Sequence, residues 1–155
     1  MEAAESGRIE KRVLIRAPRA RVWRALTDPA EFSRWFGVEM AGAFQPGVRL
    51  QMISTHEGPA KGVHFHVDVQ QRTEQQLLSW RWHPGMPDPA IDYSQEPTTL
   101  VEFRLEDAEG GTLLTVTESG FDRISLARRA RLIAENTEGW EYQTNSVRNH
   151  VEQAP

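Results

Sequence analysis

Apolar and polar residues alternate over residues 8–16, where Ile9, Val13 and Ile15 fall on one face and charged residues on the other. A period of two with β-branched residues predicts a strand that has one solvent-exposed face. The alternation recurs between closely spaced turns, which is typical of an antiparallel meander. Phe44 is predicted to begin one more short strand. The apolar positions of the other strands are Val48, Leu50 and Met52; Val63, Phe65, Val67 and Val69; Leu78, Trp80 and Trp82; Val101, Phe103 and Leu105; and Leu114 and Val116.

Helical spacing predicts two short helices after the first strand. Pro18 suits a first helical turn. Asp28 precedes Pro29, and the residue before a proline avoids the α region, so the first helix ends there. Gly37 can take the left-handed conformation that caps the second helix. The apolar positions at helical spacing are Val22, Ala25 and Leu26 in the first helix, and Phe32, Trp35 and Phe36 in the second.

The segment from about residue 124 to residue 151 contains no proline and predicts one long C-terminal helix, with a break near Gly139 left open. Residues 83–97 differ in kind, because they contain four prolines and show no period. A loop of this length inside one domain is usually functional or disordered, and its apolar residues favour a lid. The apolar stripe of the helix is predicted at Leu126, Ala130, Ile133, Trp140, Val147 and Val151.

Composition limits the class of protein. The 155 residues fit one domain, which we expect over residues 8–152, with a flexible N-terminus over residues 1–7. The absence of cysteine excludes disulfides and thiol chemistry. A net charge of −4 has the wrong sign for bulk attraction to nucleic acid. No apolar run approaches the ~20 residues of a membrane span, and no apolar signal core is present, so we expect a cytoplasmic protein without membrane insertion.

Several short motifs resemble one family. They are residues 15–18 (IRAP), 22–29 (VWRALTDP), 32–36 (FSRWF), 111–115 (GTLLT), 118–121 (ESGF) and 139–140 (GW). The chain resembles the family named after the activator of the Hsp90 ATPase, within the START and birch-pollen-allergen superfamily. The resemblance implies an α+β helix-grip fold, in which a curved antiparallel sheet wraps around a long C-terminal helix and leaves a cavity between them. Superfamily members bind lipids, hormones and polyketides there, and some act as cyclases.

This fold and the inward positions of the strands together predict the wall of a ligand cavity. Large aromatic side chains would give an apolar molecule rigid surfaces to stack against. Thr144, with Gln143, would add polar groups that need a ligand or water as partner, unless the helix is rotated and exposes them. The predicted wall is Phe32, Trp35, Phe65, Trp80, Trp82, Phe103, Trp140, Thr144 and Val147.

Glu118 is the predicted polar anchor of the cavity. If Leu114 and Val116 face the helix, a period of two places Glu118 on the same side, where the resembling family often has histidine. A carboxyl group in an apolar pocket could anchor a ligand or act as an acid. In the alternative interpretation, the strand ends before Glu118 and its carboxylate reaches water or an arginine.

His64, His66 and Asp68 share one strand face, and a hairpin centred near residues 73–74 would bring His83 opposite His64. Three imidazoles could bind zinc. The same hairpin would put the fixed cation of Arg81 opposite His66, so we predict no metal site.

Three functions follow from these observations. The favoured one is binding of a small hydrophobic molecule in the cavity, with no cofactor. The first alternative is a cyclase, dehydratase or hydrolase that uses Glu118 as general acid or base. The second is a protein-interaction module whose partner is a chaperone or another protein.

Overall fold

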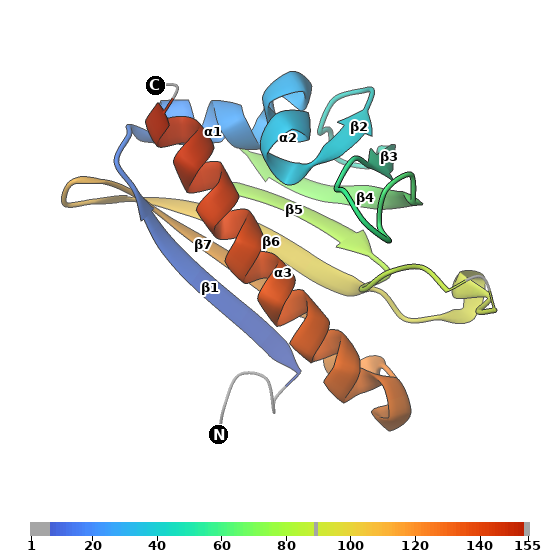
Figure 1. The fold of residues 1–155 in the computed structure, drawn as a ribbon. Helices are drawn as coiled ribbons and strands as arrows, with labels where there is room; N and C mark the ends of the chain where they lie inside the picture. Colours follow the sequence, from blue (N-terminus) through green and yellow to red (C-terminus); the bar gives the residue numbers. More distant parts are fainter. Residues whose placement is uncertain (1–6, 89, 154–155) are drawn as a thin grey trace.

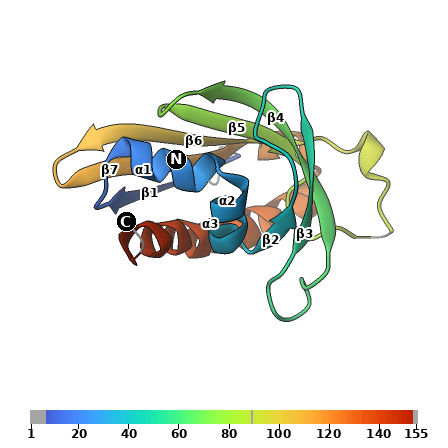
Figure 2. The same ribbon diagram turned by 90° about the horizontal axis from the view of Figure 1, so that it is seen from above.

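A curved antiparallel sheet of seven strands wraps around one long helix in the computed structural model, which describes residues 7–88 and 90–153 (Figures 1 and 2). This is the α+β helix-grip architecture predicted from the sequence. The strand order is β1-β7-β6-β5-β4-β3-β2. The strands span Arg8–Ile15 (β1), Val38–Met40 (β2), Arg49–Ser54 (β3), His64–Thr73 (β4), Leu77–Trp82 (β5), Thr99–Ala108 (β6) and Gly111–Ser119 (β7).

Helix α3, Leu126–Gln153, crosses the concave face of the sheet, and α1 and α2 pack over one end of it (Figure 1). The two short helices span Arg19–Thr27 and Pro29–Phe36, and two 3₁₀ turns span Tyr93–Gln95 (η1) and Phe121–Arg123 (η2). Asp28 separates α1 from α2, and its carboxylate accepts a hydrogen bond from the Glu31 amide at 3.2 Å. Gly37 ends α2 with a φ of 80°, as its position predicts. None of the helices in the described ranges is long and apolar enough to cross a membrane.

The inward face of the sheet forms the core. The alternation predicted for β1 is confirmed, because Ile9, Val13 and Ile15 are all buried. Phe44 is fully buried but lies in a loop, so the strand predicted there is wrong. Its ring stacks on Trp80 at 6.2 Å between centroids, which explains why an apolar residue stands at that position. The short strand of this region is β2 instead.

Helix α3 runs without interruption through Gly139. Its apolar stripe begins later than predicted, because Leu126 is 78% exposed and Ala130 is also exposed. The first turns of the helix extend beyond the sheet (Figure 1), and burial begins at Leu132. Of the segment predicted to be flexible, residues 1–6 lie outside the described residues. Gly7 is buried and its carbonyl accepts a hydrogen bond from the Phe121 amide, so the prediction is wrong for this residue.

The β4–β5 hairpin has a different register from the one predicted. The turn is centred on Gln75, because Thr73 pairs with Leu77, and an irregularity between Val69 and Gln71 then brings Asp68 opposite Arg81. As a result His83 comes near His66 rather than His64, with 6.4 Å between the ring centroids. Among the residues that the structure describes, no group of three or more His, Asp or Glu side chains is arranged to hold a metal ion.

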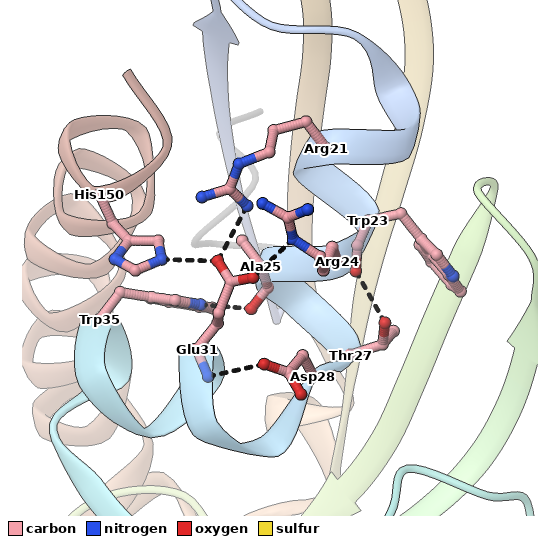
Figure 3. A network of polar contacts seen from close by, with 9 residues as sticks. All are labelled: Arg21, Trp23, Arg24, Ala25, Thr27, Asp28, Glu31, Trp35 and His150. Atoms are coloured by element: carbon pink, nitrogen blue, oxygen red, sulfur yellow. Dashed lines mark hydrogen bonds and ion pairs between the residues drawn. The ribbon is translucent and has the colours of Figure 1, made fainter. Parts of the chain in front are cut away.

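The carboxylate of Glu31 ties α2 to α1 and to the end of α3 (Figure 3). Its Oε1 accepts hydrogen bonds from Arg21 Nη1 and His150 Nε2, both at 2.8 Å, and its Oε2 accepts one from Arg24 Nε at 2.7 Å. Burial raises the pKa of Glu31, but the hydrogen bonds from His150, Arg24 and Arg21 outweigh burial and lower this pKa from 4.5 to about 2. The ionised carboxylate therefore holds three helices together and closes one end of the core.

Candidate functional site

A pocket of about 470 Å³ opens between the sheet and the middle of α3. Aromatic rings from three different elements form much of its wall: Phe65 from β4, Trp82 from β5 and Trp140 from α3. Pockets of this size and character are usual for small-molecule sites. The lining consists of Phe36, Ser54, His56, Ala60, Val63, Phe65, Trp82, His83, Gly85, Met86, Pro87, Glu135, Asn136, Gly139, Trp140, Tyr142 and Gln143.

Part of the predicted wall does not line this pocket. Trp80, for example, is fully buried, with its ring centroid 5.0 Å from that of Phe103 and 5.9 Å from that of Phe32. Helices α1 and α2 and the Phe44 loop cover this end of the sheet, so its rings pack on one another and fill the space. The prediction is corrected at Phe32, Trp35, Trp80, Phe103, Thr144 and Val147, which belong to the core.

The hydroxyl of Thr144 is also not free to bind a ligand, because it already has hydrogen-bond partners. Its hydroxyl bonds to the carbonyl of Trp140 at 2.8 Å and to that of Glu141 at 3.2 Å, both within its own helix. Such bonds to the preceding turn are the usual way in which a threonine inside a helix satisfies its hydroxyl. The side chain is buried, so the alternative in which the helix exposes it is also wrong.

Glu118 lies behind the pocket floor. Strand β7 continues to Ser119, and Glu118 has 0% exposure, so the alternative of a carboxylate in water is wrong. Its Oε1 accepts hydrogen bonds from Trp140 Nε1 at 2.8 Å and Asn136 Nδ2 at 2.9 Å. Its Oε2 accepts from Thr99 Oγ1 at 2.6 Å and Trp82 Nε1 at 2.9 Å. Four uncharged donors therefore satisfy both oxygens, which suits a carboxylate, since that group only accepts.

This arrangement changes the role expected of Glu118. Trp82, Asn136 and Trp140 line the pocket, whereas Glu118 does not. General acid–base catalysis requires the group to lie within hydrogen-bond reach of the reacting molecule. In this structure the carboxylate reaches the residues of the wall and orients their rings. Glu118 is a positioning residue for the pocket rather than its polar anchor.

The end of α2 forms a second polar junction at the pocket. The last carbonyl groups of a helix have no partner within the helix, and here α3 supplies them. Gln143 Nε2 donates to the carbonyl of Phe36 at 2.9 Å, and Ser146 Oγ donates to that of Trp35 at 2.6 Å. His56 Nε2 lies 3.0 Å from the same Phe36 carbonyl, so this nitrogen carries the proton.

The mouth of the pocket is formed by exposed apolar side chains. Met86 is 51% exposed and Tyr142 is 59% exposed, and both belong to the lining. Within the loop predicted to be a lid, His83 and residues 85–87 line the pocket. The part that contains η1 extends beyond the edge of the sheet instead (Figures 1 and 2). Only the first part of this loop therefore borders the site.

Solved structures share this fold over nearly the whole chain. Protein MLL2253 from Mesorhizobium loti has a TM-score of 0.75 at 21% identity, over 96% of this chain and 98% of its own. A protein from Arthrobacter aurescens has a TM-score of 0.78 at 17% identity, over 99% of this chain and 90% of its own. DynU16, from the dynemicin biosynthetic locus, has a TM-score of 0.71 at 23% identity, and 94% of this chain spans 47% of that protein. At these identities the likeness shows the fold alone.

A family model identifies the chain more closely than these structures do. No curated protein sequence matches the chain. The model described as "Activator of Hsp90 ATPase homolog 1-like protein" matches residues 16–152, which include α1, α2, all of α3 but its last residue, and the strands from β2 to β7. The resemblance found in the sequence motifs is thus confirmed, and the chain belongs to the Activator of Hsp90 ATPase homolog 1-like family.

Proposed function

We propose that this protein binds a small hydrophobic molecule in the pocket between the sheet and the middle of α3, without a cofactor. The observation that carries the proposal is the wall itself, in which rings of Phe65, Trp82 and Trp140 surround a space of about 470 Å³. The ring centroids of Trp82 and Trp140 lie 5.9 Å apart, and Phe65 lies 6.1 Å from Trp82. Burial of an apolar molecule among these faces is the main source of binding free energy.

The size of the pocket limits the affinity that we expect. Enclosing ~300 Å² of apolar ligand surface contributes about 7 kcal/mol at ~25 cal/mol per Å². Loss of translational and rotational freedom opposes this gain. We therefore expect dissociation constants in the micromolar range or weaker.

Gly139 offers a direct test, because it lines the pocket and a Cβ atom built on it meets no other atom within 4 Å. Gly139→Leu should place a side chain in the pocket while the helix keeps its stability, since glycine is unfavourable inside a helix by about 1 kcal/mol. Ala130→Leu is the matched control, because Ala130 is an exposed residue of α3 outside the lining.

The measurement is a titration with Nile red, an uncharged dye whose emission rises in apolar surroundings. Micromolar binding by the natural protein and by Ala130→Leu is expected, with binding by Gly139→Leu at least about tenfold weaker. Thermal unfolding should show that Gly139→Leu is no less stable. Equal binding by all three proteins would place the dye elsewhere and overturn the proposal.

A further inference from the structure

We propose that the pocket prefers an apolar molecule that carries a positive charge, such as a quaternary ammonium group, and that the indole face of Trp82 receives the cation. The inference rests on the proposed function and specifies its ligand class. Three observations carry it: the carboxylate of Glu118 behind Trp82, the rings that are exposed in the wall, and the charges of the lining.

Glu118 brings a negative charge close to the floor of the pocket without a cation beside it. Four uncharged groups donate to its carboxylate, and they belong to Trp82, Thr99, Asn136 and Trp140. Hydrogen bonds of this kind stabilise the charge of a buried anion but do not cancel it. A positive group in the pocket would therefore be attracted through surroundings of low dielectric constant.

The indole of Trp82 connects this charge to the pocket. Its Nε1 donates to Glu118 Oε2 at 2.9 Å, and a donor bonded to an anion is polarised, so the ring becomes richer in electrons. The face of an indole ring already attracts cations, and it does so more strongly than the ring of tyrosine or phenylalanine. A cation should therefore bind most strongly against the face of Trp82.

A ligand can reach this ring. Trp82 and Phe65 are both partly exposed and line the pocket, with 6.1 Å between the ring centroids and an angle of 66° between the ring planes. Trp140 also donates to Glu118, but it is only 3% exposed. The inclined rings of Trp82 and Phe65 thus form a corner in which an ammonium group can contact two aromatic faces.

The charges of the lining favour a cation over an anion. Glu135 is the acidic residue of the lining, and the described lining contains neither lysine nor arginine. Arg131 lies outside the lining, with its Nε 3.6 Å from Glu135 Oε2. His56 and His83 also line the pocket, and each directs Nε2 to a backbone carbonyl. Binding is therefore measured at pH 8, where histidine is ordinarily uncharged.

Two derivatives of benzyl alcohol isolate the charge, because their 4-trimethylammonium and 4-tert-butyl groups have the same shape. The hydroxyl group that they share keeps both in solution, and any hydrogen bond that it forms with Asn136 or Tyr142 is common to the two. Dissociation constants are measured by displacement of Nile red. We expect the cation to bind about tenfold more tightly than the neutral compound, a difference of about 1.4 kcal/mol. A pocket that is merely apolar would prefer the neutral compound, because the cation is the better hydrated.

Trp82→Phe tests the role of the indole. The phenyl ring keeps an aromatic wall but has no N–H group to bond to Glu118, so the two compounds should bind within about twofold of each other. Trp23→Phe is the matched control, because Trp23 Nε1 also donates to a glutamate, Glu74, at 3.2 Å, although Trp23 lies outside the lining. This control should keep the preference for the cation. If Trp82→Phe does not fold, a nuclear Overhauser effect between the N-methyl protons and the indole of Trp82 in the natural protein makes the same assignment.

The outcomes distinguish this inference from the proposed function. If Nile red does not bind, both fail. If Nile red binds and the neutral compound displaces it as well as the cation does or better, the inference is overturned while hydrophobic binding stands. The inference is also overturned if neither compound displaces Nile red, if Trp82→Phe keeps the preference, or if the N-methyl protons show no Overhauser effect to Trp82.

Discussion

Trp82 at the end of β5 and Trp140 on α3 direct their indole N–H groups to opposite oxygens of one buried carboxylate, that of Glu118, with 5.9 Å between the ring centroids. The two rings are thereby turned so that their nitrogen atoms point into the protein. Their carbon faces are left to the pocket. The side chain of Glu118, which lies outside the pocket, thus makes the floor of the pocket apolar by holding both indole N–H groups away from it.

Replacing Glu118 should destabilise the protein and loosen both rings. In Glu118→Gln one carboxylate oxygen becomes an NH₂ group, which faces donors instead of accepting from them, so we expect a loss of about 2–4 kcal/mol in the free energy of unfolding. Urea unfolding measures the loss, and tryptophan emission reports the change at Trp82 and Trp140. Glu106→Gln, an exposed position on β6, should change stability by less than about 0.5 kcal/mol. Equal stability of the two variants would contradict the positioning role of Glu118.

Glu31 should make stability depend on pH in acid. Its pKa is about 2 in the folded protein and 4.5 as the ordinary value, so its contribution is fully present above pH 4.5 and is lost as the pH falls towards 2. The shift corresponds to at most about 3 kcal/mol. We expect the natural protein to exceed Glu31→Gln in stability by a constant amount between pH 5 and pH 6, with the difference shrinking below pH 4.5. Other acidic groups titrate in both proteins and cancel in this comparison. A difference that grows on acidification would refute the assignment.

Gly85 should tolerate a side chain less well than Gly110 does. It has a φ of 82°, and a Cβ atom there would lie 2.5 Å from Leu132 Cδ2 on α3. Gly110 has a φ of 87°, but a Cβ atom there meets nothing within 4 Å. Both alanine variants suffer the backbone strain, of about 1 kcal/mol, and only Gly85→Ala adds the contact with α3. We expect Gly85→Ala to be the less stable in thermal unfolding and to bind Nile red differently from the natural protein. Matching effects of the two variants would show that the segment does not pack on α3.

Local spacing was enough to predict most of the secondary structure. The period of two in β1, the proline after Asp28 and the glycine at position 37 each act on neighbouring residues, so a pattern in the chain reveals them. The register of the β4–β5 hairpin was predicted wrongly because its turn is centred on Gln75 and not near residues 73–74, since Thr73 pairs with Leu77. Together with the irregularity after Val69, this moves His83 from His64 to His66.

The alternation along a strand could not show which inward residues belong to the core and which line the pocket. Trp80 and Trp82 share one face of β5, yet Trp80 is fully buried and Trp82 lines the pocket. The difference arises because Phe32 of α2 and the ring of Phe44 pack on Trp80, whereas Trp82 lies beyond them. A period of two brought Glu118 to the inner face, but its partners come from β5, β6 and α3 and are distant in the sequence.

Sequence reasoning missed Glu31 altogether. An aspartate followed three residues later by a glutamate is a known sign of a helix start, and Asp28 and Glu31 have this spacing. The pattern would have placed Glu31 at the N-terminus of α2. Its pairing with Arg21, Arg24 and His150 depends on how three helices meet, which no local pattern shows.

The four hydrogen bonds to Glu118 also determine how a molecule can enter and leave. Those from Asn136 and Trp140 fasten α3 to β7, and those from Trp82 and Thr99 join β5 and β6 to β7, so lifting the helix away would break the first two together. A ligand would therefore enter and leave on the opposite side of the pocket, past Met86 and Tyr142. The residence time of a bound ligand would then depend on small movements of residues 85–87, while the helix and the sheet stay fixed relative to each other.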